Sequence, residues 1–270
     1  MPVEVVQEGA AAVVRLNWPE KRNALGPAEA DEITDAIRRA AGSRAAAVVL
    51  CGAGAFCAGG DLRTFAELSE RLRPDEIQDQ IYGRVQAMIR ALGDVAVPTI
   101  AAVDGPAIGL GMDLMLACDV RLVGRQGWAL QGWGNAGLIA ATGGVRFVST
   151  ARPGLLWRLL ADQPRLDGPE CERLGLATAV DGSALDAAIE QADRLGRLER
   201  AALLAYVALD RPLRWPSDEH LDEAARRQAA LIGSAQFRAF AARTLGGAPR
   251  SAGPANERSD APSDQDRPQQ

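Results

Sequence analysis

The chain has 270 residues, and 47% of them are hydrophobic, so it can bury a large core within one domain followed by a tail. A net charge of −5 and an isoelectric point near 5.1 argue against a general nucleic-acid-binding surface. Lys21 is the only lysine and His220 the only histidine, which argues against histidine-based triads, histidine metal sites and any Schiff-base lysine other than Lys21.

The cysteines lie in apolar or helical contexts and show no metal-ligand spacing. They are Cys51, Cys57, Cys118 and Cys171. This usage is typical of small buried side chains in a reducing compartment. The N-terminus lacks a basic region followed by an apolar stretch, and no apolar run reaches about 18 residues. We therefore expect a cytoplasmic protein with neither a membrane nor a nucleic acid as partner.

The N-terminal third alternates between strand and helix patterns. The sequence predicts a hairpin with strands over residues 3–6 and 12–17, and then an amphipathic helix over 27–41 that starts at a proline. An apolar strand over 45–50 follows. It runs into the glycine-rich turn 52–61, where a second helix opens.

The same order of strand, glycine-rich turn and helix returns about fifty residues later. A helix over 74–92 precedes a buried strand over 99–103, and the turn after that strand opens a helix over 112–118. The two glycine-rich turns could therefore face one another. Beyond them the pattern predicts short strands at 120–123, near Trp128 and at 178–180, and helices from Leu155 to about Leu245.

The chain divides into three parts by composition. We expect a core over residues 1–195 and a helical region over 196–247. Residues 248–270 are rich in Gly, Pro, Ser, Asp and Gln, with almost no apolar residues, which predicts a disordered tail.

Motifs for nucleotide binding and serine hydrolysis are incomplete. The glycine pairs Gly52/Gly54 and Gly109/Gly111 each supply two glycines of a dinucleotide fingerprint, but the third is missing. There is no GxxxxGK[ST] phosphate loop and no GxSxG motif.

The second glycine-rich turn carries the best candidate for chemistry. The backbone N–H of Leu110 and the carboxylate of Asp113 lie three residues apart, so they share one side of a helical turn. A helix N-terminus can stabilise an oxyanion, while a nearby carboxylate moves a proton at the adjacent carbon. The alternative is that Asp113 only complements the helix dipole, as first-turn acids often do.

Four segments in the right order resemble the enoyl-CoA hydratase/isomerase, or crotonase, superfamily over roughly residues 3–245. They are NWPEKRNAL, AFCAGGDL, VPTIAAVDGPAIGLGMDLMLACDVRL and GLIAATGG. The resemblance implies an α/β fold, a crotonase-like spiral of ββα repeats with a C-terminal helical trimerisation region. It also implies a homotrimer or hexamer and an acyl thioester, with coenzyme A as part of the substrate and neither a separate cofactor nor a metal.

The resemblance assigns roles to three positions. It places the two oxyanion-binding N–H groups on Ala58 and Leu110, where leucine replaces the usual glycine and must point its side chain away from the ligand. Asp113 matches the first catalytic glutamate of the hydratases and is one methylene shorter. Trp133 stands where the second glutamate would lie, which argues against hydration because hydratases hold one water between two carboxylates.

Other positions match the family's binding segments or its neighbouring reactions. Trp133 would suit a flat or bulky acyl group, or it simply fills the space of the missing acid. Ala141 stands where a related dehalogenase has its nucleophilic aspartate. Glu67, Glu70, Asp75 and Glu76 include a possible second acid, although most should be solvated. The resemblance adds these substrate-binding candidates: Lys21 and Arg22 for CoA phosphates, Ala24, Phe56, Gly60, Asp61 (also a helix cap), Gly109 and Gly137.

The leading hypothesis is an enzyme that forms or quenches a thioester enolate with an oxyanion hole and one carboxylate, Asp113. Isomerisation or decarboxylation is favoured over hydration. One alternative is a non-catalytic acyl-CoA binding protein that has kept the fold. Another is a biosynthetic enzyme acting on a carrier-protein thioester.

Overall fold

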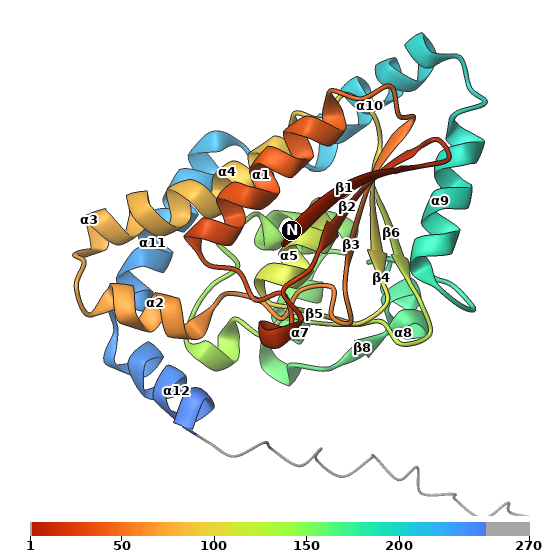
Figure 1. Ribbon diagram of the computed structural model, residues 1–270. Helices are drawn as coiled ribbons and strands as arrows, with labels where there is room; N and C mark the ends of the chain where they lie inside the picture. The colour runs from red at the N-terminus through yellow and green to blue at the C-terminus, as the bar shows by residue number, and fades with distance from the viewer. Residues whose placement is uncertain (1, 247–270) are drawn as a thin grey trace, which may run out of the picture.

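The computed structural model describes residues 2–246, which form two β-sheets surrounded by helices (Figure 1). The larger sheet has the strand order β1-β2-β3-β4-β6-β9. Its strands are β1 (Val3–Glu8), β2 (Ala11–Leu16), β3 (Ala47–Gly52), β4 (Thr99–Val103), β6 (Val120–Val123) and β9 (Thr178–Ala179). The smaller sheet has the order β5-β7-β8, with β5 (Pro106–Ile108), β7 (Trp128–Leu130) and β8 (Leu166–Asp167).

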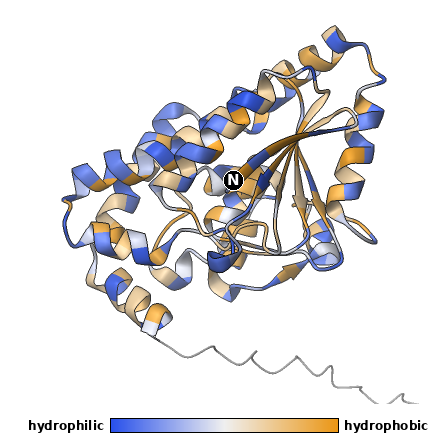
Figure 2. Cartoon of the chain, in the orientation of Figure 1, coloured by the Kyte–Doolittle hydropathy of each residue, from blue (hydrophilic) through white to orange (hydrophobic). Residues whose placement is uncertain are grey.

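The larger sheet is parallel except for the hairpin between β1 and β2. Parallel sheets are covered on both faces, and their strands are therefore apolar throughout. All five residues of β4 are buried, and alternate residues such as Ile100 and Ala101 belong to opposite faces. Figure 2 shows the strands as largely hydrophobic, whereas the outer helices mix hydrophilic and hydrophobic residues.

Helices cover both faces of the larger sheet, with α1 and α4 on one face and α9 on the other (Figure 1). The α-helices before the site are α1 (Pro27–Ala41), α2 (Leu62–Ser69), α3 (Pro74–Ile77), α4 (Gly83–Gly93) and α5 (Leu110–Ala117). Those after it are α6 (Gly144–Ala151), α7 (Leu155–Asp162), α8 (Gly168–Arg173), α9 (Ala184–Leu195), α10 (Arg200–Arg214), α11 (Asp218–Ile232) and α12 (Ala235–Gly246). Short 3₁₀ or π turns are η1 (Pro19–Lys21), η2 (Gln78–Tyr82) and η3 (Gly134–Ala136).

The predicted elements agree closely with these bounds. The helix 27–41 and the strands 99–103 and 120–123 coincide with α1, β4 and β6. The predicted helix 74–92 is interrupted by the π-helical turn η2, and the very short strands β5 and β8 were not predicted. The predicted tail 248–270 lies outside the described residues, and the boundary between 195 and 196 stays a prediction.

The two glycine-rich turns face one another, as the sequence predicted. The Cys57 N–H donates to the Pro106 carbonyl and the Ile108 N–H donates to the Cys57 carbonyl, each at 3.0 Å. A side chain at Gly111 would collide with the Cys57 carbonyl, so only glycine permits this approach. The paired turns bring the start of α5 against the loop that precedes α2.

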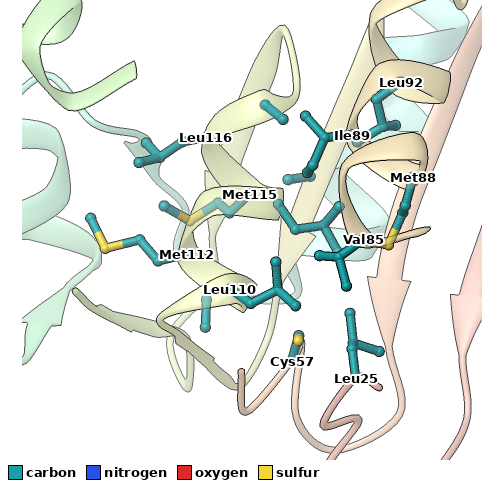
Figure 3. Packing of buried hydrophobic residues seen from close by; sticks show 14 of the residues in the cluster. Leu25, Cys57, Val85, Met88, Ile89, Leu92, Leu110, Met112, Met115 and Leu116 are labelled. Atoms are coloured by element: carbon teal, nitrogen blue, oxygen red, sulfur yellow. The ribbon is translucent and has the colours of Figure 1, made fainter. Parts of the chain in front are cut away.

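Helix α5 lies in the middle of the core and is buried along its whole length. Figure 3 shows Leu110 beside Cys57, Leu25 and Val85, while Met112 and Leu116 lie on the side of α5 that faces away from α4. Packing of this density holds the first turn of α5 in place. The side chain of Leu110 is therefore part of the core.

Helix α10 is attached to the sheet through a buried ionic cluster. Asp119, which follows α5, accepts hydrogen bonds from Arg211 and Arg214 of α10 and from the backbone and hydroxyl of Thr99. Arg211 also donates to the carbonyls of Gly93 and Val97. Burial by itself raises the pKa of Asp119, but the bond and charge of Arg211, the bond from the Thr99 N–H and the charge of Arg214 together hold that pKa below its usual range.

Candidate active site

A cavity of about 120 Å³ lies where the two glycine-rich turns meet. It is lined by Ala58, Gly59, Gly60, Leu62, Phe65, Ile108, Gly109, Leu110, Gly132, Trp133, Ala136, Leu138 and Phe240. A larger groove of about 950 Å³ runs between α4 and α10, and its lining includes Arg90, Asp94, Arg211 and Asp218. The smaller cavity is the candidate site because the motif residues converge there.

The loop before α2 is held in register by the segment that follows η1. The Leu25 N–H donates to the Gly59 carbonyl at 2.8 Å, and the Asp61 N–H donates to the Leu25 carbonyl at 2.9 Å. This is a parallel bridge between Leu25 and Gly60 in which Gly59 and Asp61 point towards Leu25. The N–H of Gly60 therefore points away from Leu25.

The structure corrects the predicted oxyanion donor Ala58. Its N–H donates to the Arg22 carbonyl at 3.0 Å, so this group is already paired. Gly59 has a φ of +106°, and this change of direction turns both Ala58 and Asp61 towards the 22–25 segment. Within residues 2–246 the Gly60 N–H has no acceptor, and Gly60 lines the cavity.

Leu110 supplies a second N–H beside the first. As the first residue of α5 it has no intrahelical acceptor, and the described part of the chain offers it none. A Cβ built on Gly59 would lie 4.0 Å from the Leu110 nitrogen, which places the two turns in direct contact. The leucine side chain joins the core instead of covering this N–H (Figure 3).

Asn23 ties the 22–25 segment to the rest of the site. Its side chain is fully buried, accepts from the Trp18 N–H at 2.7 Å and donates to the Ala55 carbonyl at 2.7 Å. Arg22 and Asn23 both have positive φ values, 53° and 56°, which make the tight turn. The buried amide thus fixes the turn whose carbonyls hold the loop at Gly60.

Asp113 lies in the first turn of α5, is only 3% exposed and is held by two donors. The Trp133 indole N–H donates to Oδ2 at 3.1 Å, and the Thr142 hydroxyl donates to the same oxygen at 2.5 Å. A methyl group on Gly144 would collide with Oδ1, so both oxygens face protein. Burial raises the pKa of the carboxyl to about 7, although the bonds from Thr142 and Trp133 lower it.

The Trp133 ring forms a wall of the cavity, whereas Asp113 is not among the lining residues. A Cβ on Gly109 would lie 3.6 Å from the indole, so the ring packs along the start of α5. Trp133 therefore lies beside both Asp113 and the start of α5, and its indole N–H bonds to the carboxylate.

Several predicted ligand residues have partners within the protein. Lys21 forms ion pairs with Glu29 at 2.6 Å and with Asp61 at 3.5 Å, so two carboxylates already balance its charge. Asp61 caps α2 through a bond from the Thr64 N–H, as predicted. Ala24 lies on the same short segment as Lys21, Phe56 is buried behind the cavity, and Gly137 packs under Gln236 of α12.

The structure also identifies residues that the sequence did not. Thr142 binds Asp113, and Phe240 of α12 contributes to the cavity wall together with Leu62, Phe65, Ile108, Ala136 and Leu138. Nothing in the local sequence marks Phe240, which lies more than ninety residues after the last of the motifs. The candidate second acids Glu67, Glu70 and Asp75 are exposed and Glu76 is partly exposed, and none of them lines the cavity.

No metal site accompanies the cavity in the described part of the chain. No three side chains among histidine, cysteine, aspartate and glutamate gather closely enough in residues 2–246 to hold a metal ion. The four cysteines are free and buried, as predicted. None of the described helices is long and apolar enough to cross a membrane.

Comparisons with known proteins agree with this arrangement. The model of the "Enoyl-CoA hydratase/isomerase" family matches residues 7–237. A "Probable enoyl-CoA hydratase" of Rhodobacter capsulatus is 33% identical over 242 residues, which is 86% of this chain and 90% of the relative. The "Probable enoyl-CoA hydratase echA6" of Mycobacterium bovis is 35% identical over 142 residues, or 48% of this chain, and the chain spans about half of its length, 54%.

Solved structures share the fold. An enoyl-CoA hydratase/isomerase from Mycobacterium paratuberculosis has a TM-score of 0.81 at 23% identity, covering 90% of this chain and 98% of that one. An enoyl-CoA hydratase from Polaromonas has a TM-score of 0.73 at 27% identity, covering 84% and 90%. The α/β architecture with C-terminal helices is therefore a crotonase fold. By sequence and by fold, the chain belongs to the enoyl-CoA hydratase/isomerase family.

Proposed function

We propose that the cavity binds an acyl thioester and stabilises its enolate with the N–H groups of Gly60 and Leu110. The observation that carries this proposal is that two backbone N–H groups, with no acceptor in the described part of the chain, lie at one small cavity. Preorganised donors of this kind stabilise the charge that develops on a thioester oxygen. Each such donor is worth about 2.7 to 4 kcal/mol in enzymes where one was removed.

In this proposal Asp113 moves the proton. It is the carboxylate next to the cavity wall, and its pKa of about 7 lies where an acid or base works best at neutral pH. A proton carrier that alternates between its two forms suits double-bond isomerisation, since one group removes a proton and returns it at another carbon. The Trp133 side chain would have to move for the carboxylate to reach the substrate.

The lining favours isomerisation over the other two reactions. Hydration needs a second carboxylate, and the described residues that line the cavity include no acid. Decarboxylation of a malonyl-type thioester would bury a carboxylate without a cation, since the lining residues within 2–246 carry no positive side chain either. Burying an unpaired charge is costly, so an uncharged unsaturated acyl group is the better substrate.

The second candidate function is acyl-CoA binding without catalysis. The observation in its favour is that Trp133 lines the cavity whereas Asp113 does not, and that the indole N–H bonds to one carboxylate oxygen. A protein of this kind would hold the thioester at Gly60 and Leu110 but would exchange no proton with it.

Deuterium exchange distinguishes the two candidates. The protein is incubated in heavy water with saturated, α,β-unsaturated and β,γ-unsaturated acyl-CoAs, and label at the α- and γ-carbons is followed by mass spectrometry. The enzyme should exchange, with a rate that rises with pH through about 7 as Asp113 ionises. Asp113→Asn should lose about 10²- to 10⁴-fold of that rate.

Asp79→Asn is the matched control, because Asp79 is exposed and outside the site. An unchanged exchange rate in Asp113→Asn would remove Asp113 from the mechanism. Tight binding with no exchange on any thioester would favour the non-catalytic candidate.

Assembly and location remain proposals that rest on the family. We propose a homotrimer or a hexamer of this chain in the cytoplasm, with coenzyme A carrying the acyl group. The C-terminal helix α10 presents the apolar side chains Tyr206, Leu209 and Leu213, which are each more than 70% exposed. Exposed apolar patches of this kind mark surfaces that other chains cover.

A further inference from the structure

The cavity offers no polar side-chain group to an acyl chain. Apart from glycines, its lining residues are alanine, leucine, isoleucine, phenylalanine and tryptophan. The one polar side-chain atom among them, the Trp133 indole nitrogen, already donates to Asp113. The backbone N–H groups of Gly60 and Leu110 are therefore left to bind the thioester oxygen, and the remaining surface suits hydrocarbon.

The volume of the cavity limits the length of that hydrocarbon. A cavity of about 150 Å³ lined by Leu, Ile and Phe accommodates benzene, which has six carbons. At about 120 Å³ the present cavity is smaller than that and must also hold the thioester carbonyl. It can accommodate a chain of about four carbons before the walls must move.

Phe240 contributes to the cavity wall from the C-terminal helical region. Helix α12 packs against α2 and η3, beside α2 in Figure 1, and these two elements carry other lining residues. Phe237 and Ala241 of α12 are buried and anchor the helix. Phe240 lies three residues after Phe237 on the same side, is partly buried and reaches the cavity.

We propose that the site selects an uncharged acyl chain of about four carbons and that Phe240 sets this length limit. The inference rests on the proposed function only in requiring that the cavity binds the acyl thioester. It does not require catalysis. Each methylene added within the cavity should tighten binding about fourfold, and methylenes beyond the limit should weaken binding because the walls must move to admit them.

Calorimetry with saturated acyl-CoAs of two, four, six, eight and ten carbons tests the limit in the full-length protein. Affinity should peak at about four carbons and fall about tenfold or more by eight. Equal or tighter binding of the eight- and ten-carbon thioesters would overturn the limit. No binding at any length would overturn the proposed function itself, which separates the two failures.

The role of Phe240 is tested by its own variants. Phe240→Ala should move the affinity maximum to eight carbons or beyond, and Phe240→Leu, which disturbs packing less, should move it part of the way. Arg243→Ala, an exposed change on the same helix, should leave the length profile as it is. If both Phe240 variants fold and keep the length profile of the wild type, another wall of the cavity sets the limit.

Discussion

At the residue scale, Asp113 is a carboxyl group whose environment favours its neutral form. It accepts bonds from Trp133 and Thr142 on one oxygen while burial opposes its charge. The two hydrogen bonds stabilise the charged form less than burial destabilises it, which leaves the pKa at about 7. Ionisation of this acid therefore lowers the free energy of unfolding.

This imbalance predicts a pH-dependent stability difference between the wild type and Asp113→Asn. The folded pKa of about 7 lies above the ordinary value of 3.8, so the folded state holds the proton more tightly than the unfolded state. The wild type should lose stability as pH rises from about 4 to about 7, by on the order of 4 kcal/mol in all, and should lose no more on this account above that range.

Asparagine has no charge to bury and can still accept both bonds. We therefore expect the free energy of unfolding of Asp113→Asn, relative to that of the wild type, to be roughly 3 kcal/mol higher at about pH 8 than at about pH 5. Urea unfolding at the two pH values measures this difference. Asp79→Asn again serves as the control. A stability difference that does not change with pH would mean that Asp113 titrates normally in the folded protein.

At the element scale, α10 depends on a buried arginine. Arg211 neutralises Asp119 and also donates to the carbonyls of Gly93 and Val97, at the end of α4 and before β4. One guanidinium therefore joins the helix, the acid and the backbone that enters the sheet. Removal of Arg211 leaves Asp119 with Arg214 as its one cationic partner and leaves buried carbonyls unsatisfied.

Arg211→Met should accordingly lower the free energy of unfolding by about 3 to 5 kcal/mol at neutral pH. Arg226→Met is the comparison, because Arg226 forms an exposed pair with Glu223 and should change stability by less than about 0.5 kcal/mol. The pKa of Asp119 is lowered, so its contribution is present at neutral pH and is lost as pH falls through that pKa. Equal losses in the two variants by urea unfolding would contradict a structural role for this cluster.

At the scale of the whole molecule, the apolar side chains of α10 have no cover within the described chain. Leu209 and Leu213 are 73% and 72% exposed, and Tyr206 is 72% exposed. If copies of the chain meet on this face, Leu209→Asp should reduce the molar mass measured by light scattering from that of a trimer or hexamer to that of a monomer. Val6→Asp, on the exposed strand β1, is the matched control. A monomeric wild type would contradict the proposed assembly.

Much of the fold could be predicted because its elements depend on local periodicity. The helix 27–41 follows from apolar residues at helical spacing after a proline, and the strand 99–103 follows from an apolar, β-branched run. The strands β5 and β8 have three and two residues, which is too short for a period to appear. Only pairing with distant segments makes them strands.

The candidate site was predicted only in part. Leu110 and Asp113 are close because one helical turn joins them, and that relation can be read from their spacing. The N–H of the predicted donor Ala58 is already paired with the Arg22 carbonyl, whereas the Gly60 N–H has no acceptor within residues 2–246. That difference arises from hydrogen bonds between segments more than thirty residues apart.

The sequence by itself determined the family, the order of the elements and the residues at the start of α5, since motif and period are local properties of the chain. The tertiary structure decided which N–H groups have no acceptor within residues 2–246, that Trp133 lines the cavity while it bonds to Asp113, and that Phe240 contributes to the cavity wall. These are matters of a few ångströms between segments distant in sequence. They depend on how the core packs, and packing is a property of the whole fold.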